Sequence, residues 1–355
     1  MPQQRNIKPA GSGDGLTVAV TGPTGEIGKP FVQALERTRE VKRILGMARR
    51  PFDPSANGWR KTEYRQGDIT NRDDVAALVE DADVVVHLAF IVLGASDATR
   101  EINLEGSRNV FRAAVEAKAK RLVYTSSVAA YGFHEDNPLP LSEDTPTRGT
   151  DAHPYSAQKA ELEQVLHEVV DGAKLDTYVF RPCIVAGPQA RMLIDAIPYV
   201  RIGERLPGVV RALFDQVPIL KPVIPDPGVP FQLVHHDDVA SALKAAVLGK
   251  GGPGVYNLAG EGEMTLSDLA EALRWYSVPV PDLAVDATAE IVSRIPFLPA
   301  EATWVNAGRV PVVMDTAKAR KQLGWKPRHS TRDTLQEVVE AYRPDLEAGH
   351  DNADA

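Results

Sequence analysis

The sequence predicts an α/β fold with a doubly wound parallel sheet. Short apolar runs alternate with amphipathic segments from residue 16 to Gly187, as in a series of βαβ units. Three glycines, Gly22, Gly25 and Gly28, stand between the first apolar run and the first amphipathic segment. Ligands of such sheets bind at the carboxyl ends of the strands, so we expect the functional site at that edge.

Each predicted strand is a short apolar run, as expected when helices cover both faces of the sheet. The runs at 16–20 and 83–88 show this most clearly. We expect strands over residues 16–20, 41–48, 63–66, 83–88, 121–125, 177–181, 231–234 and 254–258.

The predicted helices carry an apolar stripe at helical spacing, such as Ile27, Phe31 and Leu35 in the first. Asp238 precedes another such segment, where its carboxylate can cap the helix. We expect helices over residues 26–39, 73–80, 98–117, 155–170, 239–248, 266–276, 315–323 and 331–342.

The pattern changes after Pro188, where an apolar, proline-rich stretch indicates a helical insertion with loops. A chain of 355 residues has room for a second, smaller domain. We therefore expect a discontinuous C-terminal substrate domain. The predicted boundaries are a disordered leader at 1–15, a nucleotide domain at 16–188 with 231–259 returning to it, a substrate domain at 189–230 and 260–345, and a disordered tail at 346–355.

Composition excludes several classes of partner. The net charge of −8 gives no basic field for nucleic acid. The longest apolar run, residues 84–95, is too short for a membrane span, and the N-terminus lacks the apolar core of a signal peptide. One cysteine, Cys183, excludes an internal disulfide framework. We expect a cytoplasmic protein that acts on a small molecule.

The glycine turn is suited to a dinucleotide. Residues without Cβ let the backbone approach a pyrophosphate, and the following helix N-terminus presents free N–H groups to it. Because a strand precedes the turn and an amphipathic helix follows it, the context favours a Rossmann-type domain over an unrelated glycine turn. The predicted phosphate contacts are Gly22, Thr24, Gly25, Glu26, Ile27 and Gly28.

The end of the second strand predicts which nicotinamide cofactor binds. An acidic residue there would bind a ribose diol, whereas arginine suits a 2′-phosphate. The strand ends in Arg49 and Arg50 with no acid. We expect NADP(H) to be preferred, with NAD(H) as the alternative; the competing interpretation is that these arginines are solvated loop charges.

Further cofactor contacts are expected at the ends of the next strands. Asp68, beside Ile69, could accept a hydrogen bond from the adenine amino group or serve equally well as a turn carboxylate. His87 is interpreted as a core histidine. The remaining predicted contacts along the cofactor's path are Leu88, Ala89, Phe90, Thr125 and Pro182.

Tyr155 and Lys159 lie four residues apart, so they share one face of a helix. A free tyrosine has a pKa of about 10, and a neighbouring ammonium lowers it. With a hydroxyl from Ser127 or Ser126, the pair could move a proton while a hydride moves. By itself the spacing would fit a surface pair on any helix. The competing Tyr131 has no such lysine and is assigned to the substrate pocket or to structure.

The two neighbouring histidines, His235 and His236, raise the hypothesis of a metal site. Adjacent residues on a strand point to opposite faces and cannot chelate together. We therefore interpret His235 as structural and expect no metal.

These motifs resemble the extended branch of the short-chain dehydrogenase/reductases, the NAD-dependent epimerase/dehydratase family. The resemblance implies that Ser127, Tyr155 and Lys159 are catalytic, that a nicotinamide cofactor binds a Rossmann domain, and that the protein is often a homodimer. It is carried by Thr21–Gly28, Gly67-Asp68, His87–Ala89, Asn103–Gly106, Tyr124–Gly132, Pro154–Lys159, Arg181-Pro182, Gly187-Pro188, Val234–Ala240, Val255–Leu258, Asp315–Arg320 and Leu323–Pro327.

The family's sugar-nucleotide epimerases usually carry an asparagine where this chain has Pro182 or Cys183, and an arginine near the position of Phe231. These differences, with the apolar stretch at 189–230, favour an apolar substrate. Cys183 is either a pocket residue or simply buried.

Three functions follow, in order of preference. The first is an NAD(P)-dependent oxidoreductase acting at a secondary alcohol or ketone carbon, with Tyr155 as general acid/base and a steroid-, terpenoid- or flavanol-like substrate. The second is a sugar-nucleotide epimerase or dehydratase that retains its NAD(P). The third is a non-catalytic protein that senses NADP(H).

Overall fold

The computed structural model describes residues 15–92, 97–190, 223–280 and 310–347. Parts of the predicted domains lie outside the described residues: 1–14 of the leader, most of the insertion at 189–230, residues 281–309 of the substrate domain, and 348–355 of the tail.

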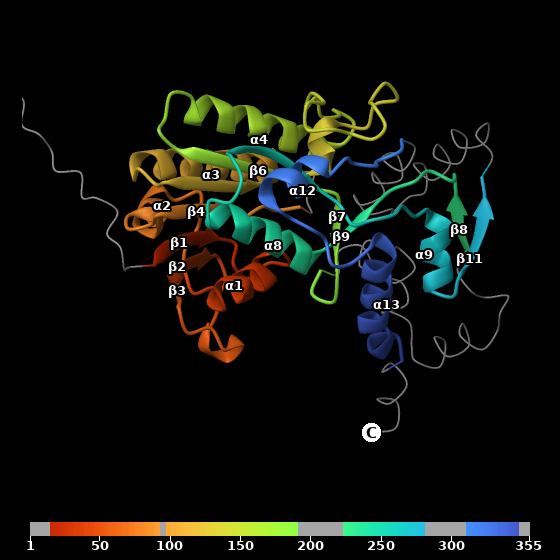
Figure 1. The fold of residues 1–355 in the computed structure, drawn as a ribbon, viewed down its shortest axis with the longest axis horizontal. Coiled ribbons are helices and arrows are strands. Elements are labelled where there is room, and N and C mark those ends of the chain that lie inside the picture. Colours follow the sequence, from red (N-terminus) through yellow and green to blue (C-terminus); the bar gives the residue numbers. More distant parts are fainter. Residues whose placement is uncertain (1–14, 93–96, 191–222, 281–309, 348–355) are drawn as a thin grey trace, which may run out of the picture.

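Seven parallel strands form the central sheet, in the order β10-β6-β5-β4-β1-β2-β3 (Figure 1). Strands β1 and β4 are neighbours although two further strands separate them in sequence, so the strand order reverses at β1. This confirms the predicted doubly wound, Rossmann-type sheet. The strands are β1 Leu16–Thr21, β2 Val41–Ala48, β3 Thr62–Gln66, β4 Val84–His87, β5 Arg121–Thr125, β6 Asp176–Pro182 and β10 Gly254–Leu258.

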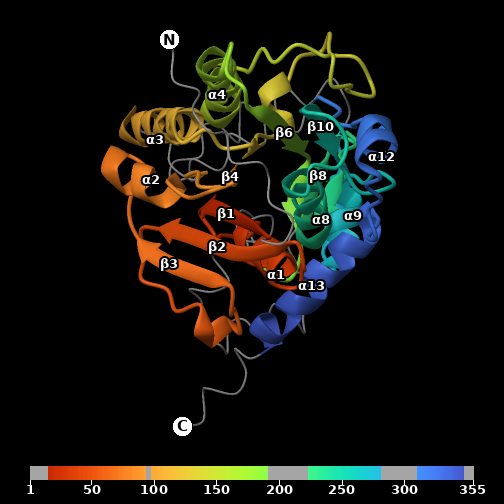
Figure 2. The same cartoon turned by 60° about the vertical axis from the view of Figure 1, so that its left-hand side comes forward.

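Helices cover both faces of the sheet (Figures 1 and 2). One face carries α1 (Gly28–Glu36) and α8 (His236–Val247), and the other carries α2 (Arg72–Val79), α3 (Asp97–Glu116) and α4 (Pro154–Val170). Side chains of β1 alternate between the two cores: Val18 and Val20 join one, and Ala19 joins the other. This burial on both faces explains the continuous apolar runs.

A second group of elements lies beside the carboxyl ends of these strands (Figure 1). It has its own core, which includes Leu233, Leu269 and Leu335. Its elements are β7 Ile184–Ala186 paired with β9 Leu233–His235, β8 Val223–Asp226 paired with β11 Tyr276–Pro279, α9 Leu266–Ala272 and α13 Thr331–Glu347. The remaining short elements are η1 Ser55–Asn57, η2 Val128–Tyr131 and α12 Ala317–Leu323, and the last two pack into a core of the main sheet.

Two predicted helix boundaries need correction. The first helix begins at Gly28 rather than at residue 26, because the glycine turn takes up the preceding residues. The helix predicted to run to residue 276 ends at Ala272. Arg274 adopts a left-handed conformation, with φ of 59°, and this turns the chain into β11.

The predicted cap of α8 is wrong. The helix begins at His236 with His235 as its N-cap, whose ring accepts the Asp237 amide at 3.2 Å. Asp238 lies inside the first turn. Its buried carboxylate accepts hydrogen bonds from the backbone amides of Arg328 and His329 at 2.9 and 3.0 Å. Asp238 therefore binds a segment that is distant in sequence instead of capping its own helix.

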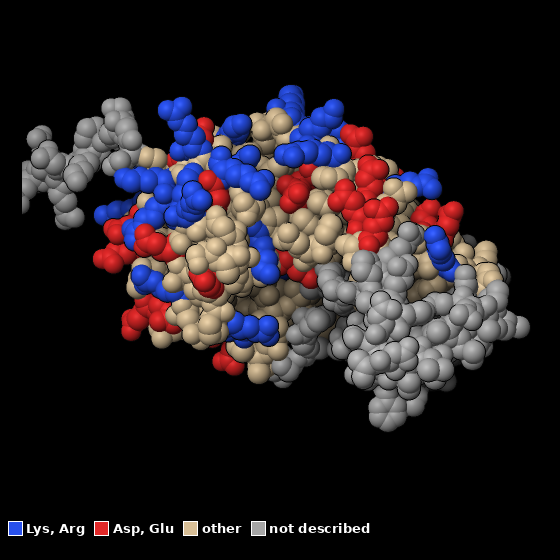
Figure 3. Space-filling view, turned by 90° about the horizontal axis from the view of Figure 1, so that it is seen from below, with Lys and Arg blue, Asp and Glu red and all other residues tan. Residues whose placement is uncertain are grey.

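On the face shown in Figure 3, basic and acidic side chains are interspersed. Among the described residues, no helix has both the length and the apolar character that crossing a bilayer requires.

Candidate active site

The glycine turn between β1 and α1 is closely packed. Gly22 has a φ of +71°, and a Cβ there would lie 2.9 Å from the backbone of Ala89. A Cβ on Gly28 would lie 2.1 Å from the carbonyl oxygen of Gly22. Both positions therefore require glycine.

The turn forms a cradle at the N-terminus of α1. The N-cap residue Ile27 makes no side-chain capping hydrogen bond, so no side chain of that residue competes for the first-turn amides. Thr24, Gly25 and Glu26 line a hollow at this point. A cradle of backbone amides with no room for Cβ atoms fits a pyrophosphate.

The hollow is also lined by three residues that the sequence patterns did not predict: Lys29, Asn57 and Gln189. Lys29 lies one turn beyond Gly25, and its amide donates to the Gly25 carbonyl at 3.0 Å, so helical spacing could have indicated it. Asn57 is the last residue of η1 and Gln189 lies in a turn after β7, and no local pattern marks either residue.

Arg49 and Arg50 follow β2, and both are exposed. Side chains of β3 hold their backbone: Gln66 donates to the Arg49 carbonyl at 2.9 Å, and the Tyr64 hydroxyl donates to the Arg50 carbonyl. This arrangement fixes the loop and leaves the two side chains at the surface.

Asp68 serves as a turn carboxylate. Its Oδ1 accepts both the amide and the hydroxyl of Thr70 at 2.9 Å, as in an Asx-turn. Ile69 packs against one face of the sheet and approaches Gly106 of α3. The adenine contact of Asp68 and Ile69 stays a prediction.

His87, at the end of β4, is a core histidine. It is 1% exposed, and its two ring nitrogens pair with the hydroxyls of Thr21 and Ser107 at 2.7 and 2.9 Å. Burial, with a smaller effect of the Lys159 charge, lowers its pKa to about 3.

The chain after β4 runs into the candidate proton-transfer site. The backbone amide of Leu88 donates a hydrogen bond to the Thr21 carbonyl, and that of Ala89 donates to the Thr21 hydroxyl. The Phe90 ring lies edge-on to Tyr155, with centroids 5.6 Å apart. It also lies 4.0 Å from the Lys159 ammonium.

Helix α4 presents Tyr155 and Lys159 on one face. His153 caps the helix by accepting the Ser156 amide at 3.2 Å, and Pro154 occupies its first position. Lys159 is 3% exposed, and its Nζ donates to the Thr125 carbonyl at 3.1 Å. Burial lowers the pKa of Lys159 to about 7, and the charge of Glu163 opposes that shift.

The structure brings Ser127 to the same place. The expected lowering of the Tyr155 pKa is wrong: burial raises it, and a hydrogen bond with Ser127 opposes the increase. The Ser127 Oγ also accepts the Ala129 amide at 3.2 Å as the cap of η2. A phenol, an ammonium and a hydroxyl therefore converge, and together they can hold and transfer one proton.

Two neighbouring predicted contacts lie at strand ends. The Thr125 Oγ1 is buried and has no hydrogen-bond partner within the described ranges, so it is available to a ligand. Pro182 is buried at the end of β6.

Tyr131, assigned to the substrate pocket or to structure, is buried. Its side chain is 0% exposed, and its hydroxyl donates to the Asn257 Oδ1 at 2.7 Å. Tyr131 is therefore a core residue, which was the alternative. Cys183 also lies in the core at 4% exposure, and burial raises the pKa of its thiol, so a pocket role for it has no support here.

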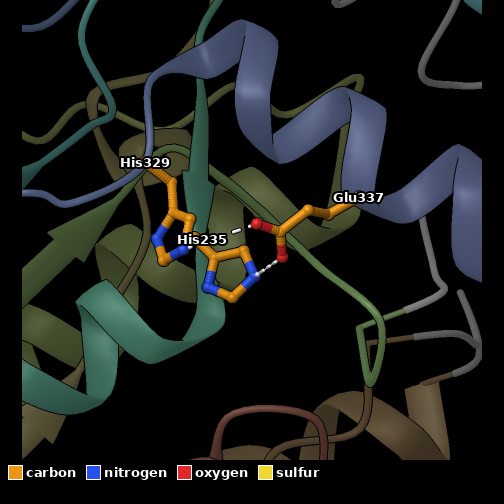
Figure 4. Close-up of side chains that lie close together, drawn as sticks. All are labelled: His235, His329 and Glu337. Carbon is orange, nitrogen blue, oxygen red and sulfur yellow. Dashed lines mark ion pairs between the residues drawn. The ribbon is translucent and has the colours of Figure 1, made fainter.

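The expectation that His235 and His236 point to opposite faces is wrong. The strand ends between them, and their rings lie on the same side with centroids 4.3 Å apart. His235 also stacks on His329, with centroids 3.9 Å apart, and both approach Glu337 of α13 (Figure 4).

This histidine cluster, His235, His329 and Glu337, offers three ligand atoms within 4.8 Å of one another. However, the Nδ1 of His235 already accepts an amide, and the stacked rings do not aim their in-plane lone pairs at one point. We assign the cluster to the packing of α13 against β9. The expectation that no metal binds stays a prediction.

Comparison with known proteins now identifies the family. The model of the NAD dependent epimerase/dehydratase family matches residues 18–259. The chain belongs to this family. The matched range contains both the glycine turn and the Tyr155–Lys159 pair, and family membership indicates an NAD-dependent enzyme of the epimerase/dehydratase type.

Relatives within the family have different substrates in their names. Human 3 beta-hydroxysteroid dehydrogenase type 7 is 33% identical over 217 residues, which cover 54% of this chain and 56% of that protein. The dTDP-glucose 4,6-dehydratase of Streptomyces venezuelae, solved with NAD bound, has a TM-score of 0.70 at 21% identity, over 94% of this chain and 98% of that one. The UDP-glucose 4-epimerase of Thermotoga maritima has a TM-score of 0.67 at 22% identity, over 93% and 100%. These two structures support the fold.

Proposed function

We propose that this protein is an NAD(P)-dependent oxidoreductase acting at a secondary alcohol or ketone carbon. One observation carries the proposal: Lys159 is buried 5.8 Å from the centre of the Tyr155 ring, beside Ser127, at the strand ends that adjoin the glycine turn. A phenol beside an ammonium and a hydroxyl is an arrangement in which a tyrosine can act as general acid or base.

The residues of the site have distinct roles. A bound nicotinamide dinucleotide supplies or accepts the hydride. Tyr155, which burial keeps protonated at neutral pH, donates its proton to a ketone oxygen and recovers it in the reverse direction. Ser127 donates a hydrogen bond to that oxygen. The Lys159 ammonium stabilises the phenolate and holds the ribose hydroxyls near the nicotinamide.

The cofactor proposed is NADP(H) in preference to NAD(H). The exposed arginines at 49 and 50, with no acid at the end of β2, support this choice. The dehydratase of S. venezuelae was solved with NAD, so NAD(H) is the alternative that a direct comparison must address.

An apolar substrate is the favoured class. The partial match to a hydroxysteroid dehydrogenase supports it. Phe231 also supports it, because the family resemblance leads us to expect a diphosphate-binding arginine near that position in a sugar-nucleotide enzyme. The neighbours named for dTDP-glucose and UDP-glucose favour the second candidate, a sugar-nucleotide dehydratase or epimerase.

The two candidates differ in how they use the cofactor. Oxidation of NADPH in step with added steroid ketones supports the oxidoreductase. Cofactor that co-purifies and is never consumed, together with tight binding of UDP- or dTDP-sugars, supports the epimerase or dehydratase. Cofactor binding without turnover of either class would support a non-catalytic NADP(H) sensor. A homodimer is also proposed, and sedimentation would test it.

Replacement of Tyr155 by phenylalanine tests the mechanism. We expect Tyr155→Phe to lower kcat by about 10²–10⁴-fold while leaving dinucleotide affinity within about threefold, since the lost hydroxyl acts on the substrate. The measurements are steady-state rates and a fluorescence titration with NADPH. Tyr276→Phe, at a tyrosine 48% exposed on β11, is the control. An undiminished rate in Tyr155→Phe would refute the assignment.

A further inference from the structure

A buried carboxylate lies one helical turn beyond Lys159. Glu163 of α4 has a side chain only 10% exposed, and it forms a bidentate ion pair with Arg181 of β6, at 2.9 Å to Nε and 2.6 Å to Nη2. The Ser126 hydroxyl donates to the same carboxylate at 2.5 Å. A charge at this depth requires such partners, but the ion pair by itself does not explain the bond to Ser126.

Through Ser126, Glu163 holds the strand end that forms the site. Ser126 lies between Thr125, whose carbonyl accepts the Lys159 ammonium, and Ser127. The carboxylate of Glu163 therefore joins α4, which carries Tyr155 and Lys159, to the segment after β5, which carries Ser127.

Arg181 links the Glu163 carboxylate to the residues that follow Ser127 in the chain. Its guanidinium lies 4.6 Å from the centre of the Tyr131 ring. Tyr131 is the last residue of η2, the short helix that Ser127 caps, and its hydroxyl bonds to Asn257 of β10. Both flanks of Ser127 are thus held by one buried network.

The network also places charge near Lys159. The titratable groups that face Lys159 within the described ranges are His87 of β4, Tyr124 of β5, and Tyr155 and Glu163 of α4. His87 is neutral at pH 7 and the tyrosines are protonated. In this group, Glu163 supplies the negative charge that favours the ammonium.

We propose that Glu163 is a positioning residue for the Ser127–Tyr155–Lys159 site, fixing Ser127 through Ser126 and placing a carboxylate one helical turn from Lys159. The inference rests on the proposed function, in which the Lys159 ammonium holds the cofactor's ribose.

The test is the pH dependence of NADPH and NADH binding, measured by fluorescence titration from pH 5 to 9. In the unaltered protein we expect affinity to fall as pH rises through about 7, where Lys159 loses its proton. In Glu163→Gln the midpoint should move to lower pH by about 1 unit. Glu161→Gln is the matched control, because Glu161 lies on the same helix but pairs with Arg100 at the surface; it should leave the midpoint unchanged.

Glu163→Gln leaves Arg181 buried without its partner, which could prevent folding. The double variant Glu163→Gln/Arg181→Met removes both charges, so no unpaired charge stays buried and the pH dependence can be measured on a folded protein. It should shift the midpoint in the same direction, because Glu163 is the charge that acts on Lys159.

The outcomes separate the two proposals. Failure of the unaltered protein to bind either dinucleotide would overturn the proposed function and this inference with it. Binding that is independent of pH in the unaltered protein, or that has the same midpoint in the Glu163 variants, would overturn the inference alone. Lower thermal stability in the variants with an unmoved midpoint would show a merely structural role.

Discussion

At the scale of single residues, burial decides the chemistry of the site. The ammonium of Lys159 would be a solvated cation on an exposed helix face, but at 3% exposure its pKa falls to about 7. Its proton is therefore exchangeable near neutral pH, and small changes in nearby charge determine whether it is present.

Arg49 and Arg50 carry the prediction about the cofactor. We expect Arg49→Ala/Arg50→Ala to weaken NADPH binding by about 10–100-fold and to leave NADH binding nearly unchanged, because a hydrogen bond to a charged group contributes about 1.5–3 kcal/mol. Titration of each variant with both dinucleotides gives the two dissociation constants.

Arg43→Ala is the control for that measurement. Arg43 lies nearer the other end of β2 and pairs with Glu63 at 2.6 Å, so its removal should not change the ratio of the two affinities. A preference for NADPH that persists without both arginines, or a preference for NADH in the unaltered protein, would contradict the assignment.

At the scale of elements, the β1–α1 turn depends on close backbone packing. We expect Gly28→Ala to lower dinucleotide affinity by more than about 100-fold, since its Cβ would lie 2.1 Å from the Gly22 carbonyl oxygen and a displaced cradle loses several N–H contacts to phosphate. Isothermal calorimetry with NADPH would measure this change, and circular dichroism would verify folding.

Gly252→Ala is the matched control for the turn. A Cβ at Gly252 would have nothing within 4 Å, so this substitution should leave affinity and stability nearly unchanged. Equal affinities for Gly28→Ala and Gly252→Ala would show that the turn does not hold the cofactor.

Helix α4 presents Tyr155, Lys159 and Glu163 at successive turns of one face. The four-residue spacing predicts the first pair, and the same spacing reaches the third. What the spacing does not reveal is which face is buried. That became evident only from the packing of α4 beside the ends of β5 and β6.

At the scale of the whole molecule, the reversal of strand order at β1 explains why two distant motifs meet. The carboxyl ends of β1, β4 and β5 lie side by side, so the glycine turn adjoins the loops that carry Phe90 and Ser127. Such a switch point is where open α/β sheets bind ligands.

The C-terminal part of the chain is attached through Asp238. We expect Asp238→Asn to lower the free energy of unfolding by about 3 kcal/mol, because an amide cannot accept both backbone N–H groups and the His329 ring as the carboxylate does. Urea denaturation would measure the loss.

Asp237→Asn is the neighbouring control. Its side chain is 54% exposed, and we expect a change of about 0.5 kcal/mol or less. A comparable loss in both variants would show that the stability of α8, rather than the bond to residues 328 and 329, is affected.

Local patterns predicted much of the fold and part of the site. The strand and helix positions followed from apolar periodicity, because each element buries its faces in a sheet covered on both sides. The predicted cap of α8 was wrong because a distant contact overrode a local preference. His235 is the N-cap of α8, and Asp238 accepts hydrogen bonds from the segment before α13.

The sequence alone determined the parts of this protein that depend on residues near one another along the chain: the order of strands and helices, the glycine turn and the Tyr155–Lys159 spacing. Tertiary structure decided the rest. It buried Tyr131 against Asn257, stacked His235 on His329, and paired Glu163 with Arg181. These partners lie far apart in sequence, so their contacts arise only when the packed sheet and helices bring them within hydrogen-bonding distance.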